Sequence, residues 1–405
     1  MEQRMIIGAV VLGAIVVVAV GIVGLMIYSP PEPEPPEEFA RIRYGGQYYP
    51  GEFLLKGYPD LWEKYHLNVT HTLFASGAEN NEALLSRKVD VNCGSDTKTI
   101  SLFNAAAEGG NIEPLIIGTL QRGDRYSTVI PADSSITSWT ELEGERIGYR
   151  AGTGADTIMR RYFADDPDGL GLSFDDFDWQ SMDVADMAAA LQADQIAAFT
   201  AWEPTPAIAV DQGIGKLLRS YGDVALVPVS LHTTKSYAAE NPDILISFLA
   251  AHLDKLDMIK NNRSTAADYA ADAASEYGSA VSAVAFEDLF QRIDYTVDFN
   301  TTIIDDILAT ANFLKNELDP PLIDTIPTLN YNRSFIEAAK ELQEKVSIAK
   351  LTLANPLDLA AKIAIKHGLA RSSLRLEASM FYSLLQEIQA AMVNFLVEIK
   401  SCCIS

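Results

Sequence analysis

Residues 199–206 read Phe-Thr-Ala-Trp-Glu-Pro-Thr-Pro, an apolar run that ends in a turn. They close a series of similar junctions, at each of which an apolar run ends and a helical pattern begins. The earlier junctions are the strand end at Gln47 and the turns Ser76-Gly77, Gly94-Ser95-Asp96, Gln121-Arg122-Gly123 and Gly152-Thr153-Gly154-Ala155. Turns at helix N-termini present backbone N–H groups that bind anions and polar ligands. The series therefore predicts the rim of one ligand-binding cleft.

Strand-like and helix-like stretches alternate through the first half of the chain. Strands are expected at residues 41–47, 68–75, 89–93, 114–120, 126–131, 146–150, 196–202 and 224–230, and helices at 52–65, 78–87, 97–108, 155–163 and 183–193. This alternation predicts parallel α/β sheets. Because the pattern restarts near residue 146, we expect two lobes joined by two crossing strands, with a ligand bound between them.

The order and spacing of these junctions resemble a known family. Further motifs that carry the resemblance are Pro131-Ala132-Asp133-Ser134, residues 138–144 (Ser-Trp-Thr-Glu-Leu-Glu-Gly), residues 191–195 (Leu-Gln-Ala-Asp-Gln) and Trp202-Glu203-Pro204. Residues 41–340 resemble the nitrate/sulfonate/taurine group of ABC-transporter substrate-binding proteins, which is related to thiamine-pyrimidine binders and has the type II periplasmic-binding-protein fold. The resemblance implies that the chain captures a small solute outside the cell and delivers it to membrane permease subunits. It implies neither an enzyme nor a cofactor, and it leaves the solute unnamed.

The same comparison sets the expected domain boundaries. Lobe I is expected to comprise residues 39–132 and a mainly helical second part at 226–345, and lobe II to comprise residues 133–225. Residues 346–405 form a C-terminal extension in which basic side chains outnumber acidic ones. Apolar residues in it recur at helical spacing: Phe381, Leu385, Ile388, Met392, Phe395 and Ile399. This stripe predicts a helix packed on the body or on a partner, although a segment with no defined structure remains an alternative.

The N-terminal residues predict a membrane anchor. Residues 5–28 carry no charge, and as a helix they would span about 36 Å, enough to cross a bilayer. A cleaved signal peptide is the alternative. Arg4 precedes the run, which favours an N-terminus inside the cell and a body outside, a topology expected of an archaeal anchored protein. Residues 29–38 are rich in Pro and Glu and predict a stiff linker.

The predicted ligand-binding residues come from the junctions. The full set is Gln47, Ser76, Gly77, Ser95, Asp96, Gln121, Arg122, Thr153, Gly154, Ala155, Trp202 and Glu203. Ser76 and Asp96 could instead only cap helices, and Trp202 could only pack between lobes.

Charge in the predicted set indicates the kind of ligand. Arg122 is the only cation among these turns and suits an acid group, although it could equally pair with Asp124. Glu203 could bind an amine, or steady the turn before Pro204. We therefore expect a small monoanionic or zwitterionic ligand, such as an aliphatic sulfonate, taurine or nitrate.

Composition excludes several classes of function. The net charge of −24 argues against nucleic acid as a partner, because phosphates demand basic patches. The five histidines show no metal-ligand spacing, and no Gly-x-Ser-x-Gly motif is present. A membrane-tethered sensory module that reports ligand to a signalling partner remains the alternative function.

Overall fold

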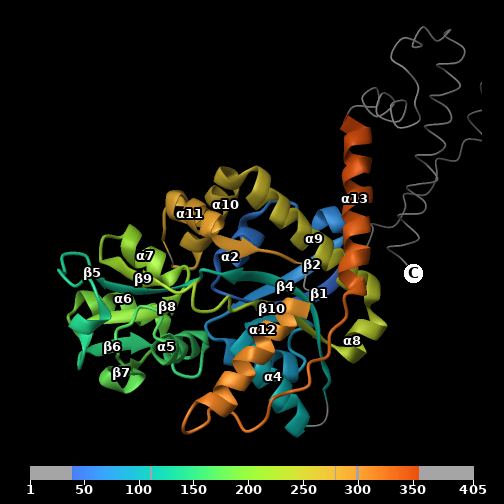
Figure 1. Ribbon diagram of the computed structural model, residues 1–405. Coiled ribbons are helices and arrows are strands. Elements are labelled where there is room, and N and C mark those ends of the chain that lie inside the picture. Colours follow the sequence, from blue (N-terminus) through green and yellow to red (C-terminus); the bar gives the residue numbers. More distant parts are fainter. Residues whose placement is uncertain (1–38, 110–111, 279, 298–300, 355–405) are drawn as a thin grey trace, which may run out of the picture. The chain divides into compact units, whose positions relative to one another are not determined.

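The predicted two-lobed α/β architecture is confirmed. The computed structural model describes residues 39–109, 112–278, 280–297 and 301–354, which form two sheets with helices around them (Figure 1). The first sheet has the strand order β11-β4-β10-β3-β1-β2, and the second has the order β7-β6-β8-β5-β9. We call the parts of the chain built on these sheets lobe I and lobe II.

Lobe I is built on the six-stranded sheet. Its strands are β1 (Ala40–Gln47), β2 (Leu67–Phe74), β3 (Val91–Ser95), β4 (Pro114–Gly123), β10 (Val229–Thr234) and β11 (Ile293–Tyr295). β1 is parallel to β2 and β3, whereas β10 is antiparallel to β3 and β4. Every residue of β3 is buried, because the strand lies between β1 and β10. The parallel strands β1, β2 and β3 therefore end at one edge of the sheet, where the predicted turns begin.

Lobe II is built on the five-stranded sheet. Its strands are β5 (Tyr126–Pro131), β6 (Arg146–Tyr149), β7 (Asp178–Ser181), β8 (Ala198–Trp202) and β9 (Gly215–Ser220). β6 is parallel to both β7 and β8, and β5 is antiparallel to β8 and β9. The chain crosses between the sheets twice, after β4 and after β9. We call residues 124–125 the first crossing and residues 221–228 the second.

Helices cover both sheets and supply the second part of lobe I. They are α2 (Pro50–Gly57), α3 (Gly77–Leu85), α4 (Asp96–Gly109), α5 (Gly154–Asp165), α6 (Val184–Gln192), α7 (Thr205–Asp211), α8 (Lys235–Glu240), α9 (Pro242–Asn261), α10 (Arg263–Glu276), α11 (Ala283–Arg292), α12 (Thr301–Asn312) and α13 (Ser334–Ala354). α13 packs along α9, as Figure 1 shows.

The first boundary between the lobes differs from the prediction. Lobe I was expected to continue to residue 132, but β5 belongs to the second sheet, where Thr128 pairs with Thr200 of β8 and with Arg219 of β9. The chain therefore enters lobe II after Gly123. The sequence alone cannot show this, because β4 and β5 follow each other like the two arms of a hairpin.

The second predicted boundary, between residues 225 and 226, lies within the second crossing, but the strand that follows begins later than predicted. A strand was expected at residues 224–230, but β10 begins only at Val229. The backbone N–H of Val224 donates to the carbonyl of Tyr221 at 3.1 Å, and Val227 has a φ of +29°, so these residues form a turn. The short strands β7, β9 and β11 were not predicted, because they are brief and show no clear apolar alternation.

The predicted terminal segments lie outside the described residues. This applies to the anchor at 1–28, to the linker at 29–38 and to the apolar stripe of the C-terminal extension. Within the part of the chain that the structure describes, no helix combines the length and apolar character needed to cross a bilayer.

A buried histidine links β10 to its neighbours beneath the predicted turns. His232 is fully buried; its Nδ1 lies 2.9 Å from Asn92 Oδ1 on β3, and its Nε2 lies 2.9 Å from the Thr99 hydroxyl on α4. Burial lowers the pKa of His232 to about 3. The folded state therefore holds the ring neutral at a pH where the unfolded chain, with a pKa near 6.5, binds a proton.

We predict that this histidine makes the fold sensitive to acid. Stability should be lost as the pH falls from about 6.5 toward 3, with a slope of up to about 1.4 kcal/mol per pH unit from this group. Urea unfolding of the wild type and of His232→Asn, compared between pH 7 and pH 5, measures it. The variant should start less stable but show the shallower pH dependence. Equal slopes would remove His232 from the acid response.

Candidate functional site

Two helix N-termini, one from each lobe, meet at the boundary between the lobes. The hydroxyl of Thr97 on α4 lies 3.1 Å from the hydroxyl of Thr157 on α5. α4 follows β3, and α5 follows β6, so both helices begin at the ends of parallel strands. Helix N-termini carry partial positive charge and free N–H groups. The place where they meet is the candidate functional site.

The polar groups of the turn between β3 and α4 form hydrogen bonds within lobe I. One carboxylate oxygen of Asp96 accepts from the backbone N–H of Thr97 at 2.7 Å, and the other accepts from the hydroxyl of Thr310 at 2.6 Å. Burial raises the pKa of Asp96. Ser95 is buried, and its carbonyl accepts from the hydroxyl of Thr99. Asp96 therefore serves its own helix, as the alternative interpretation allowed.

Gln47, Ser76 and Gly77 lie together, as predicted, and a lysine lies with them. Ser76 caps α3 by accepting from the backbone N–H of Glu79 at 3.3 Å. A Cβ added to Gly77 would stand 2.6 Å from Lys98 Cγ and 3.3 Å from Gln47 Oε1. A glycine is needed here because the Lys98 side chain passes over it. Lys98 was not predicted from the sequence, because it lies within the first turn of α4 and not in the turn that precedes this helix.

The turn before α5 packs against the start of lobe II. The Thr153 hydroxyl accepts from the backbone N–H of Ala155 at 3.3 Å and donates to the carbonyl of Arg150 at 2.7 Å. A Cβ on Gly154 would collide with the phenol oxygen of Tyr126. Glycine at this position therefore allows the N-terminus of α5 to contact Tyr126, the first residue after the first crossing.

The first crossing carries a buried arginine that the sequence analysis did not single out. Arg125 is only 1% exposed, and its Nε donates to the carbonyl of Val227 in the second crossing at 3.0 Å. Its Nη2 donates to Tyr126 Oη at 2.8 Å, whereas its Nη1 is buried and has no hydrogen-bond partner among the described residues. The guanidinium lies over the rings of Tyr49 and Tyr126, at 5.4 and 4.5 Å from their centroids.

Arg122 forms an ion pair, whereas Gln121 is buried. Arg122 is partly exposed, and its Nε lies 2.7 Å from a carboxylate oxygen of Asp294 on β11. The alternative predicted for Arg122 was an ion pair with Asp124. Arg122 does form an ion pair, but its partner is Asp294. Gln121 is buried, and its Nε2 has no hydrogen-bond partner. The ion pair of Arg122 with Asp294 joins β4 to β11.

Trp202 ends β8, Glu203 follows it, and both are buried. One carboxylate oxygen of Glu203 accepts from Arg292 Nη2 at 2.5 Å and from the Ser127 hydroxyl at 3.3 Å. The other accepts from the backbone N–H of Ala207 at 3.0 Å. Burial raises the pKa of Glu203, and the charge of Arg292 opposes that rise. Glu203 thus joins lobe II to α11 of lobe I.

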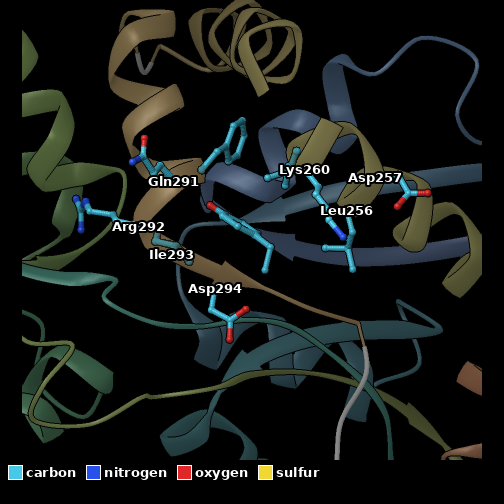
Figure 2. A pocket seen from close by; sticks show the side chains of 10 residues that line it. Leu256, Asp257, Lys260, Gln291, Arg292, Ile293 and Asp294 are labelled. Carbon is cyan, nitrogen blue, oxygen red and sulfur yellow. The ribbon is translucent and has the colours of Figure 1, made fainter. Parts of the chain in front are cut away.

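A separate groove lies on lobe I. Figure 2 shows it between α9 and the segment formed by α11 and β11, with a volume of about 550 Å³. Its lining residues are Leu256, Asp257, Ile259, Lys260, Phe290, Gln291, Arg292, Ile293, Asp294 and Tyr295. Several of its charged groups are already paired, Asp294 with Arg122 and Arg292 with Glu203. None of the predicted ligand-binding residues lines it.

Within the described residues, no group of three or more His, Cys, Asp and Glu side chains could hold a metal ion.

The fold is the two-lobed α/β fold of periplasmic binding proteins. It is similar to the alkanesulfonate-binding protein SsuA from Xanthomonas axonopodis pv. citri bound to MOPS, with 19% identity over 73% of this chain and 98% of that chain, and a TM-score of 0.61. The periplasmic aliphatic sulphonate binding protein SsuA from Escherichia coli is 20% identical over 71% of this chain and 94% of that chain, with a TM-score of 0.57. A Candida albicans protein with the generic periplasmic binding protein fold is 16% identical over 75% of this chain and 95% of that chain, with a TM-score of 0.53.

Sequence comparison places the chain in a family. The model of the family described as NMT1/THI5 like matches residues 62–266, about half of the chain. The chain therefore belongs to the NMT1/THI5-like family, which agrees with the resemblance seen in its motifs. No curated protein sequence matches it.

We predict that the contact between Gly154 and Tyr126 is a tight steric constraint. Gly154→Ala should lower the free energy of unfolding by about 1–3 kcal/mol, because the new methyl group meets the Tyr126 phenol oxygen. In a Tyr126→Phe background the cost of the same change should shrink, because that oxygen is gone. Denaturant unfolding of the four variants of this double-mutant cycle measures the coupling. An equal cost in both backgrounds would contradict the constraint.

Proposed function

We propose that the protein captures a small solute between its two lobes. The observation that carries this proposal is the meeting of α4 and α5, from different lobes, at Thr97 and Thr157. Within the described residues, two buried polar atoms lack hydrogen-bond partners, Nη1 of Arg125 in the first crossing and Nε2 of Gln121 near the end of β4. Buried polar groups are normally hydrogen-bonded, so unpartnered ones at a lobe boundary are the expected mark of a site that a ligand completes.

Capture involves closure of one lobe on the other and no covalent chemistry. The two crossings are short, so they can act as the hinge while each sheet moves as a body. A solute that touches both lobes binds the closed form more tightly than the open one and shifts the population toward it. The contact between Thr97 and Thr157 belongs to the closed form, because its two hydroxyls come from different lobes.

The solute is a small monoanion or zwitterion such as an aliphatic sulfonate, taurine or nitrate. The N-termini of α3, α4 and α5 supply partial positive charge there. Two proteins of similar fold carry alkanesulfonate and aliphatic sulphonate binding in their names, which supports the same class of ligand here.

Delivery to the permease subunits of an ABC importer is the step after capture. The apolar run at residues 5–28 supports a single membrane anchor that holds the body outside the cell next to such a permease. The similar folds of two sulfonate-binding proteins support a role in binding.

Calorimetry tests the proposal. The purified full-length chain is titrated with alkanesulfonates, taurine, nitrate, bicarbonate and a hydroxymethylpyrimidine. At least one should bind with a dissociation constant below about 1 mM and raise the melting temperature further as its concentration is increased. The absence of any such binder would contradict solute capture of this kind.

A further inference from the structure

The helix α12 of lobe I reaches lobe II beside the candidate site. The hydroxyl of Thr310 on α12 donates to Asp96, the first residue of α4, at 2.6 Å. The carbonyl of Ala309, one residue earlier, accepts from Arg161 of α5 at 3.4 Å. The Arg161 guanidinium also lies 4.9 Å from the ring centroid of Phe313, just after α12. α12 therefore contacts both α4 and α5, the two helices whose N-termini meet at the boundary between the lobes.

Asp306 lies on the same face of α12 as Thr310, because the two residues are four positions apart in one helix. Burial raises the pKa of its carboxyl group, whereas the charge of Arg122 at the end of β4 lowers that pKa. The carboxylate of Asp96 raises it further, and Arg161 of lobe II lowers it. Asp306 is therefore close enough to β4, to α4 and to α5 for their charges to act on it.

One carboxylate oxygen of Asp306 is buried without a partner. Its Oδ2 forms no hydrogen bond in the described part of the chain. The two nearby arginines have other partners: Arg122 pairs with Asp294, and Arg161 donates to Ala309. Buried polar atoms are normally hydrogen-bonded. An unpartnered carboxylate oxygen beside a proposed ligand site therefore indicates a donor that the solute would supply.

A second unpartnered group at the boundary has the opposite charge. Arg125 in the first crossing is only 1% exposed, and its Nη1 lacks a hydrogen-bond partner among the described residues. Arg125 and Asp306 both interact electrostatically with Asp96, whose own two oxygens already accept from Thr97 and Thr310. The boundary thus holds an unpartnered acceptor as well as an unpartnered donor, an arrangement complementary to a solute that carries both charges.

We infer that Asp306 binds the ammonium group of a zwitterionic solute and makes the site prefer it over a plain anion of the same shape. The inference rests on the proposed function, which allows both kinds of solute, and it adds a residue that decides between them. An ammonium group carries three donors, so one of them can complete the hydrogen bonding of Asp306 Oδ2. Because that oxygen is buried, the resulting charge pair is screened less by water than a pair on the surface.

Pairs of solutes with the same shape test the preference on the unaltered protein. Taurine differs from 1-propanesulfonate, and homotaurine from 1-butanesulfonate, by an ammonium group in place of the terminal methyl group. In calorimetry with the full-length chain, at least one amino compound should bind at least about tenfold more tightly than its alkyl partner, which corresponds to about 1.4 kcal/mol. A smaller preference in both pairs would overturn the inference.

Substitution of the aspartate tests the residue. Asp306→Asn keeps the size of the side chain and removes its charge. It should reduce the preference for the amino compound at least about tenfold and change the affinity for the alkyl partner by less than about threefold. The melting temperature of the ligand-free variant should stay within a few degrees of the wild type, because Oδ2 makes no hydrogen bond in the described part of the chain.

Asp305→Asn is the matched control. It removes the same charge from the exposed neighbouring residue of α12, so the preference for the amino compound should not change. An equal loss of preference in the two variants would assign the effect to the general charge of α12 and overturn the role of Asp306.

The outcomes separate this inference from the proposed function. If no solute binds, solute capture itself fails. If only solutes without an ammonium group bind, or if Asp306→Asn folds and keeps the wild-type preference, capture stands and the role of Asp306 is wrong. If Asp306→Asn does not fold, Asp306→Ser takes its place with the same expected loss of preference. If neither variant folds, Asp306 serves the fold and the inference is overturned.

Discussion

The boundary between the lobes depends on the hydrogen bonds that the buried residue Arg125 makes. Its side chain reaches from the first crossing to Val227 in the second, and its backbone carbonyl accepts from the N–H of Glu203 at the end of β8. One residue therefore joins both connections between the lobes to the strand that carries Trp202. A connection built in this way places a full positive charge at the boundary between the lobes. The helix N-termini add only partial charges to it.

The sequence shows where the turns lie because each turn is a local feature. The cap at Ser76 and the short glycine-rich start of α5 at Thr153 and Gly154 can be recognised from neighbouring residues alone, and the structure has both. The alternation of strands and helices predicts the α/β class for the same reason. The sheet to which β5 belongs depends on pairing with β8 and β9, which lie far along the chain, so the boundary at residue 132 could not be predicted correctly.

Arg122 and Arg125 show what could not be predicted from the sequence alone. Arg122 lies in a recognisable turn motif, and Arg125 lies three residues later with no motif around it. Arg122 is neutralised by Asp294, which reaches it only because β11, a strand of three residues, pairs with β4. Asp96 and Glu203 are likewise engaged by Thr310 and Arg292, which come from distant helices. Whether a charged group is free for a ligand is set by such long-range partners. The sequence alone therefore cannot show which charged groups a ligand can reach, in a chain whose net charge is −24.

A crystal structure of the full-length chain with 1-propanesulfonate tests the central claim most directly. The account predicts the ligand between the lobes, where the N-termini of α4 and α5 meet. A ligand bound instead in the groove between α9 and β11 would contradict it.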